Sequence, residues 1–171
     1  MKLIKFFIVM ASFRSFALDH GLWDQVLKTR VDSYGFFDYK NFIKNKSETE
    51  KLNRYLSDLS KISNSEYGSM SMSQKKAFLI NAYNAFTVKL ISDNFWQKKN
   101  KQIESIKDLG GWFSSPWKQE FFSLLDGKIK TLDQIEHGYL REKGKKKKTF
   151  HDYRVHAALN CASRSCPRLL N

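Results

Sequence analysis

Cysteine and proline are scarce in this chain of 171 residues, which contains two of each. Two cysteines are too few for the disulfide framework that holds small secreted scaffolds together. Eight glycines without a repeat also exclude a collagen-like chain. Hydrophobic residues nevertheless make up 42% of the sequence and aromatic residues 15%, which is enough apolar material for the core of one globular domain.

Acidic residues are also scarce, because 17 Asp and Glu stand against 30 Lys and Arg and give a formal net charge of +13 at pH 7. Such an excess can indicate a nucleic-acid or anionic-membrane partner. The lysines are scattered, however, and no motif typical of nucleic-acid recognition is present. We therefore interpret the charge as a solvated basic surface and expect no specific nucleic-acid partner.

Long hydrophobic runs are missing as well. The clearest run, residues 6–13, is far shorter than the roughly 20 residues of a membrane-spanning helix, so no membrane span is expected. It follows the basic start at residues 1–5 and precedes small residues at 15–17 that suit a signal peptidase. This order predicts a signal peptide over residues 1–17 and export, periplasmic or secreted, of residues 18–171. Export would place both cysteines in an oxidising compartment.

Apolar residues recur at the spacing of one helix face over residues 19–33 and 52–62, which predicts two one-sided helices. Ser47 and Thr131 each precede a Glu or Gln by three residues, the spacing of a capping box. We expect one helix to begin at Ser47. The helix expected after Thr131 would face inward with Ile135, Tyr139 and Leu140.

Residues 74–91 are apolar on nearly every side, which indicates a buried central helix. Asn81 and Asn84 lie three residues apart on one face of this helix. A buried amide without partners costs about 1–3 kcal/mol. We therefore expect both amides to bind the backbone of a neighbouring element or to belong to a site.

Three segments have patterns typical of extended chain. Residues 36–39 are short and aromatic. Residues 153–160 show a strand-like period of two, although a helix is possible over so few residues. Asp126 and Gly127 form a hairpin signal between two short apolar runs. Together with the helices, these patterns predict an α+β fold: a predominantly helical single domain around the buried central helix, with a small antiparallel sheet beside it.

Most reactive side chains lie near the end of the sequence. The run from Asn160 to Pro167 is too polar for a core strand and too rich in small residues for an exposed helix, which indicates a tight loop. The candidates in this region are His151, Arg154, His156, Cys161, Ser163, Arg164, Ser165 and Cys166.

The sequence resembles the domain-of-unknown-function family 547, which occurs in bacterial exported proteins and in plant proteins. Residues 77–87, 132–141 and 154–167 carry the resemblance, which extends from about residue 23 to the end. It implies a bacterial member with the fold of that family and no settled activity. Family members continue beyond the Cys-Pro pair with helical sequence, so the resemblance also implies that this chain lacks a C-terminal part.

One interpretation of the terminal cluster is thiol chemistry on amide or ester bonds. A Cys161 thiolate would be the nucleophile and His156 its base, and the base needs an orienting group on its other ring nitrogen. Glu136, Asn81 or Asn84 can supply that group. This interpretation predicts a hydrolase or transferase in which the His156 and Cys161 side chains lie within about 4 Å, directly or through one water.

Two alternatives give the cysteines other roles. Cys161 and Cys166 can form a disulfide, which suits an exported protein and excludes thiol chemistry. Metal binding would use His151, His156 and both cysteines, which lie at intervals of five residues, but zinc sites usually show tighter pairs. We therefore expect no metal and no cofactor. The disulfide leads to a second function hypothesis, a non-catalytic binding or scaffold module.

The expected ligand is an unidentified small molecule or peptide, and the sequence does not specify an oligomeric state. The aromatic loop at residues 112–122 is the best candidate for a pocket wall. Glu136 has a second interpretation as a structural partner of Arg154, in which case breaking the pair would cost about 3–5 kcal/mol. The candidate binding residues are Tyr83, Trp117, Arg154, Ser163 and Ser165.

Overall fold

The computed structural model describes residues 18–97, 101–103, 105–110, 115–144, 150, 152–162 and 166–169, and most of these residues are helical. The elements are α1 (Gly21–Arg30), α2 (Tyr39–Phe42), α3 (Lys46–Ser60), α4 (Asn64–Ser69), α5 (Met72–Asp93), β1 (Trp96–Gln97), β2 (Lys101–Gln102), η1 (Ile106–Leu109), η2 (Pro116–Lys118), η3 (Gln134–Leu140) and η4 (Tyr153–Ala158). η3 is a π-helix and the other three η elements are 3₁₀-helices. Within these ranges, no helix combines the length and the apolar character needed to cross a membrane.

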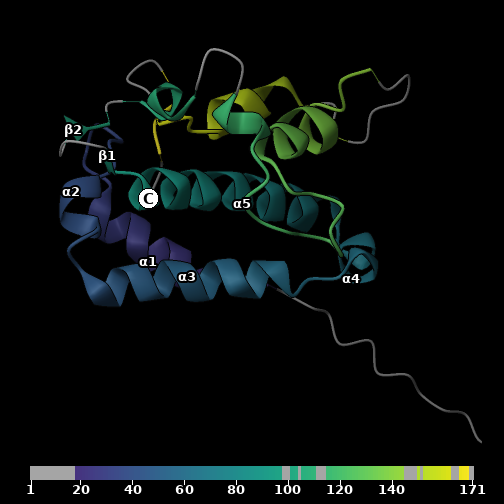
Figure 1. The fold of residues 1–171 in the computed structure, drawn as a ribbon. Helices are drawn as coiled ribbons and strands as arrows, with labels where there is room; N and C mark the ends of the chain where they lie inside the picture. Colours follow the sequence, from purple (N-terminus) through teal and green to yellow (C-terminus); the bar gives the residue numbers. More distant parts are fainter. Residues whose placement is uncertain are drawn as a thin grey trace, which may run out of the picture.

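Helix α5 lies at the centre of the molecule, with α1 and α3 on one side and the elements after residue 115 on the other (Figure 1). A capping box fixes its start, because Ser71 Oγ accepts from the Gln74 N–H at 3.3 Å and Gln74 Oε1 accepts from the Ser71 N–H at 2.9 Å. Side chains on several faces of α5 are buried, among them Tyr83 and Phe86. The predicted buried central helix is confirmed.

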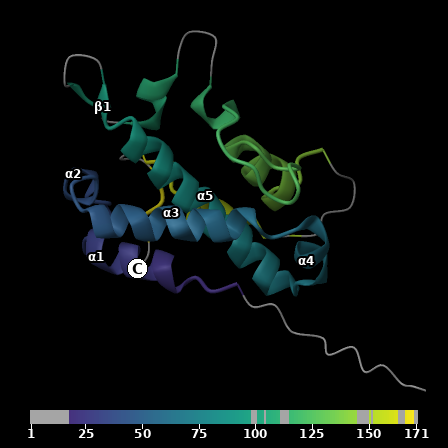
Figure 2. The ribbon, with the colours of Figure 1, turned by 60° about the horizontal axis from the view of Figure 1, so that its bottom comes forward.

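Helices α1 and α3 form the layer next to α5, which crosses α3 obliquely (Figure 2). α3 buries one stripe of side chains, Leu52, Tyr55, Leu56 and Leu59, at the spacing of one helix face. Trp23 of α1 packs parallel to Tyr55, with ring centroids 6.3 Å apart and planes 9° apart. Both one-sided helices expected from the sequence are therefore confirmed.

The start of α3 differs from the prediction. Asn45 is the N-cap: its side-chain oxygen accepts from the Glu48 N–H at 3.2 Å, and its amide nitrogen donates to the Glu48 carboxylate at 2.9 Å. Glu48 is buried and also binds Arg30 of α1. The prediction that the helix begins at Ser47 is wrong, because these contacts fix Glu48 as the third residue of the helix.

The predicted α+β architecture is wrong, because the described part of the chain has no sheet layer beside α5. The pairing that is present joins β1 to β2, a ribbon of two residues per strand beyond the end of α5. Residues 36–39 contribute one isolated bridge, between Phe37 and Val31. The molecule is a helical domain in which extended pairing is local.

The segment predicted as a strand over residues 153–160 begins with the 3₁₀-helix η4. Val155 and Leu159 are buried, but Ala157 between them is exposed, so burial repeats every four residues rather than every two. Alanine tolerates both environments, and counting Ala157 as an inward residue produced the false period of two.

The turn predicted at residues 126–127 is present, but the chain on either side does not form a ladder. Leu124 and Ile129 make an isolated bridge. Moving away from the turn, the next backbone hydrogen bond joins Phe121 to Lys130. Residues 122 and 123 therefore have no partner on the opposite side, where Ile129 and Lys130 are consecutive. This bulge ends the pairing after one bridge.

The capping box predicted at Thr131 is confirmed. The Gln134 N–H donates to Thr131 Oγ1 at 3.0 Å, and the Thr131 N–H donates to Gln134 Oε1 at 3.2 Å. The helix that follows packs against α5 and buries Ile135 and Leu140, while Tyr139 is half-buried. This contact brings η3 to the face of α5 that carries the candidate site.

The last described residues return to the connection between α1 and α2. The Leu169 N–H donates to the Gly35 carbonyl at 3.2 Å, and the Leu169 side chain is buried. Gly35 has a φ of +79°, and a methyl group there would overlap the Arg168 side chain. Residues 166–169 therefore pack closely against the first helical layer.

Candidate functional site

The side chain of Asn84, in α5, binds backbone groups at the end of η4. Its amide nitrogen donates to the Ala158 carbonyl at 2.9 Å, and its amide oxygen accepts from the Asn160 N–H at 2.9 Å. The side chain is buried, and both ends of the amide are satisfied. The expectation that this amide binds the backbone of a neighbouring element is confirmed for Asn84.

Asn81 behaves differently from Asn84. It is half-buried, and no hydrogen bond within the described residues involves its side chain. Residues three apart on an α-helix point about 60° apart, so only one of the two amides faces η4. The premise that both amides are buried is wrong for Asn81, whose amide is accessible to water.

Glu136 of η3 gathers three polar side chains around its carboxylate, and we name Tyr83, Glu136, Arg141 and His156 the Glu136 cluster. Oε1 lies 3.2 Å from Arg141 Nη1 and 3.8 Å from His156 Nδ1. Oε2 accepts from the Tyr83 hydroxyl at 3.4 Å. The Glu136 side chain is 14% exposed, whereas that of His156 is 70% exposed. The cluster therefore presents an accessible imidazole in front of a shielded carboxylate.

The π-helix explains how Arg141 reaches Glu136. In an α-helix two residues five apart would point about 140° away from each other. A π-helix bonds residue i to residue i+5, which brings this pair to the same side, and the Arg141 N–H donates to the Glu136 carbonyl at 2.8 Å. Arg141 was not predicted as a site residue because its spacing from Glu136 matches no α-helical face.

The interpretation of Glu136 as the structural partner of Arg154 is wrong. Arg154 binds Asp152 instead, with Nε 2.9 Å from Oδ1. Asp152 also accepts from Lys76 of α5 at 2.9 Å and caps η4 through the Arg154 N–H. α5 thus holds η4 at its start through Asp152 and at its end through Asn84, with His156 between them.

Two pKa shifts describe the surroundings of the cluster. Burial, reinforced by the charge of Glu136, raises the pKa of Tyr83 well above its ordinary value, against a hydrogen bond with Trp117 that lowers it. Tyr83 is therefore a neutral hydroxyl that can donate. The hydrogen bonds from Arg154 and Lys76 hold the pKa of Asp152 far below its ordinary value, so Asp152 keeps its charge at the start of η4.

Cys161 and Cys166 form a disulfide, with Cα atoms 5.7 Å apart. Asn160 spans the loop that the disulfide closes: its amide nitrogen donates to the Pro167 carbonyl at 2.7 Å, and its amide oxygen accepts from the Ala162 N–H at 2.8 Å. Within the described residues, no hydrogen bond joins His156 to Cys161, and His156 faces Glu136 instead. Of the three cysteine roles considered, nucleophile, disulfide and metal ligand, the structure contains the disulfide.

Several predicted site residues lie outside the described residues, namely His151, Ser163, Arg164 and Ser165. Among the residues that are described, no three His, Cys, Asp or Glu side chains gather as metal ligands. The site residues that the structure brings together are Asn84, Tyr83, Glu136 and His156, with Trp117 beside Tyr83.

The chemistry open to the Glu136 cluster follows from its geometry. The Glu136 carboxylate lies 3.8 Å from Nδ1 of His156, close enough to pair with the ring when the imidazole is protonated. The exposed ring can then bind a ligand or exchange a proton through Nε2. The thiol nucleophile considered for Cys161 is not available in this structure, since the two sulfur atoms of the neighbouring loop are bonded to each other.

Comparison with known proteins places most of this region in one family. The family described as "Protein of unknown function, DUF547" matches residues 67–170, which is more than half of the chain. The match covers α5, the Glu136 cluster and the disulfide loop. No curated protein and no solved structure matches the chain.

Proposed function

Because the chain belongs to the DUF547 family, whose function is unknown, we propose from its geometry that it is a non-catalytic binding module with a structural Cys161–Cys166 loop. The observation that carries this proposal is the way the loop is held. A disulfide closes it, Asn160 spans it, and Asn84 ties it to the central helix. These contacts hold residues 160–162 and 166–167 against the central helix, and so keep the neighbouring surface in one position for a ligand.

The Glu136 cluster is the part of this surface that would contact the ligand. His156 and the nearby Arg154 are exposed and can donate hydrogen bonds, and the Tyr83 hydroxyl binds Glu136 within the cluster. A small molecule or a peptide with hydrogen-bond acceptors fits these groups. We also propose that residues 1–17 direct export, since a disulfide persists in the oxidising compartments outside the cytosol.

Thiol alkylation tests the structural role of the loop. The purified protein is treated with iodoacetamide at neutral pH, before and after reduction in denaturant, and labelled cysteines are identified by mass spectrometry. We expect no labelling before reduction and labelling of both cysteines after it. Rapid labelling of one cysteine in the unreduced protein would contradict the proposal.

A thiol hydrolase or transferase is the second candidate function, and the position of Glu136 favours it. A carboxylate at Nδ1 of His156 is the orienting group that a catalytic base requires. In a reduced form, the Cys161 thiolate would attack the carbonyl carbon of an amide or ester, and His156 would return the proton to the leaving amine or alcohol. Water would then release the acyl group and restore the thiol.

The variant Cys166→Ser separates the two functions, because it leaves Cys161 as a free thiol. A hydrolase requires a thiolate stabilised by His156, so alkylation of Cys161 near neutral pH would be faster than that of an ordinary thiol and would slow at least tenfold in Cys166→Ser/His156→Ala. A binding module requires no such dependence. Equal rates in the two variants would exclude the hydrolase.

A further inference from the structure

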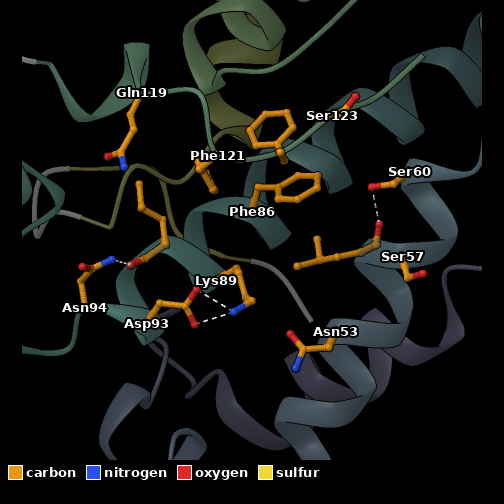
Figure 3. Close-up of a pocket in the computed structure, with 13 residues that line it drawn as sticks. Asn53, Ser57, Ser60, Phe86, Lys89, Asp93, Asn94, Gln119, Phe121 and Ser123 are labelled. Carbon is orange, nitrogen blue, oxygen red and sulfur yellow. Dashed lines mark hydrogen bonds and ion pairs between the residues drawn. The ribbon is translucent and has the colours of Figure 1, made fainter. Parts of the chain in front are cut away.

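A groove of about 540 Å³ opens between α3, the C-terminal half of α5 and residues 119–123 (Figure 3). None of its lining residues belongs to the Glu136 cluster or to the disulfide loop. The α5 residues that line the groove begin at Phe86, three residues after Tyr83. Its volume falls within the roughly 300–1,000 Å³ of pockets that hold small organic ligands.

One wall of the groove is aromatic. Phe86 and Phe122 stack with ring centroids 4.0 Å apart and planes 16° apart, and Phe121 meets Phe122 edge-on at 4.8 Å. Phe86 is buried, but Phe121 and Phe122 are half-buried and keep part of their ring surface accessible. The accessible parts of Phe121 and Phe122 give the groove an apolar wall.

The rim of the groove carries neutral polar groups. Asn53 on α3 and Gln119 opposite it are exposed, and their amides come from different walls (Figure 3). No hydrogen bond within the described residues uses either amide, so each offers two N–H donors and one carbonyl acceptor. Ser57 and Ser123 add exposed hydroxyl groups to the rim.

The groove has no net charge, although the chain carries +13. Lys89 and Asp93 are the charged residues that line it, and they bind each other at 2.6 Å. The amide of Asn94 is bonded to the Leu90 carbonyl at 2.8 Å. The groups left for a ligand are therefore amides, hydroxyls and ring faces.

From this chemistry we infer that the groove binds a neutral saccharide of about two sugar rings. A sugar ring has an apolar C–H face for the aromatic wall and a rim of hydroxyl groups that donate and accept, as amides do. A purely apolar ligand would desolvate the amides without bonding them, at about 1–3 kcal/mol for each group. A charged ligand would find no free opposite charge. A peptide that adds as a strand needs free backbone groups at a strand edge, whereas the polar groups of this groove are side chains.

Isothermal titration calorimetry of the purified full chain tests this inference with maltose, cellobiose and N,N′-diacetylchitobiose, and with a blocked neutral tripeptide for comparison. We expect at least one disaccharide to bind with a Kd below 10 mM and the tripeptide not to bind. Each of Asn53→Ala and Gln119→Ala should weaken that binding about fivefold, the loss of one hydrogen bond. Both side chains are exposed, so the fold should be unchanged.

The variant Gln25→Ala is the matched control, because Gln25 is an exposed amide on α1 that does not line the groove. It should bind the disaccharide as the parent does. The inference is overturned if none of the three disaccharides binds, if only the tripeptide binds, or if the two groove variants bind as tightly as the control. Since no lining residue belongs to the Glu136 cluster, His156→Ala should leave saccharide binding intact, which separates this result from the proposed function.

Discussion

At the scale of single residues, Asn84 joins the central helix to the segment that carries His156 and the disulfide. Asn84→Ala removes both of its hydrogen bonds and leaves the Ala158 carbonyl and the Asn160 N–H without these partners. Each unpaired buried group costs about 1–3 kcal/mol. We expect the free energy of unfolding in urea to fall by roughly 2–4 kcal/mol.

Asn81→Ala is the matched control for this prediction. It removes the same side chain one turn earlier on α5, from a half-buried position without protein hydrogen bonds. Its effect should stay below about 1 kcal/mol, as for most substitutions at accessible sites. Equal losses in the two variants would show that the backbone contacts of Asn84 contribute nothing beyond helix packing.

His20 gives the stability of the fold a dependence on pH. Nδ1 of His20 lies 2.6 Å from the Tyr55 hydroxyl, and burial lowers its pKa below 6.5, while the charge of Asp19 opposes the shift. The unfolded chain therefore takes up this proton more readily than the folded protein, and protonation favours unfolding. The contribution of His20 is complete above pH 6.5 and is lost as the pH falls from there through its folded pKa.

Urea unfolding at about pH 7.5 and pH 5.5 measures this effect, with His20→Gln as the comparison, because glutamine does not titrate in this range. The parent should lose more stability between the two pH values than the variant does. The same loss in both proteins would assign the pH dependence to other groups.

At the scale of elements, an ion pair joins the two helices of the first layer. Arg30 of α1 and Glu48 of α3 are 15% and 10% exposed at their side chains, and Arg30 Nη2 donates to Glu48 Oε1 at 2.9 Å. Removing Arg30 leaves the shielded Glu48 carboxylate without its cation, and removing Glu48 leaves Arg30 with only the more exposed Asp38, 3.6 Å away. Losing one partner of a buried pair costs about 3–5 kcal/mol. We expect Arg30→Met and Glu48→Leu each to lower the free energy of unfolding by a few kcal/mol.

The double variant Arg30→Met/Glu48→Leu should lose clearly less than the sum of the single losses, since it leaves no unpaired charge between α1 and α3. Thermal or urea unfolding of the four proteins completes the cycle. Additive losses would mean that the two side chains act through packing and that their ion pair does not stabilise the contact.

Elements with a strong local signal were predictable from the sequence. Residues 74–91 are apolar on nearly every side, and Thr131 and Gln134 form a capping box. Both signals predict a helix without tertiary information. The strand expected over residues 153–160 failed because the small side chain of Ala157 carries no information about its environment. The predicted sheet is wrong as well, since the two segments joined by the turn at residues 126–127 pair through a single bridge.

The sequence was enough to name most residues of the site, but not to predict how their side chains are arranged. Glu136, His156, Tyr83 and Asn84 were named from polar groups within apolar or reactive segments, and the structure brings them together. Arg141 was missed because π-helical register cannot be read from a spacing that assumes 3.6 residues per turn.

At the scale of the whole molecule, the last described residues return to the first helical layer. Residues 166–169 follow the disulfide loop and pack against the connection between α1 and α2, where Leu169 binds the Gly35 carbonyl. The disulfide, the Asn84 contacts and this last contact therefore lie along one segment. Loss of the contact at Gly35 should release the end of that segment while the loop itself stays closed.

The variant Gly35→Ala tests the contact between Leu169 and Gly35, and Gly144→Ala is its control. Both glycines have positive φ, +79° and +83°, so alanine at either position is strained by about 1–2 kcal/mol. At Gly35 the added methyl group would overlap the Arg168 side chain, whereas at Gly144 no atom of the described part of the chain lies within 4 Å of it. Gly35→Ala should therefore lower the melting temperature further and speed hydrogen exchange at the Leu169 amide. If both variants lose the same stability and the Leu169 amide stays protected, the return of the chain end does not close the fold.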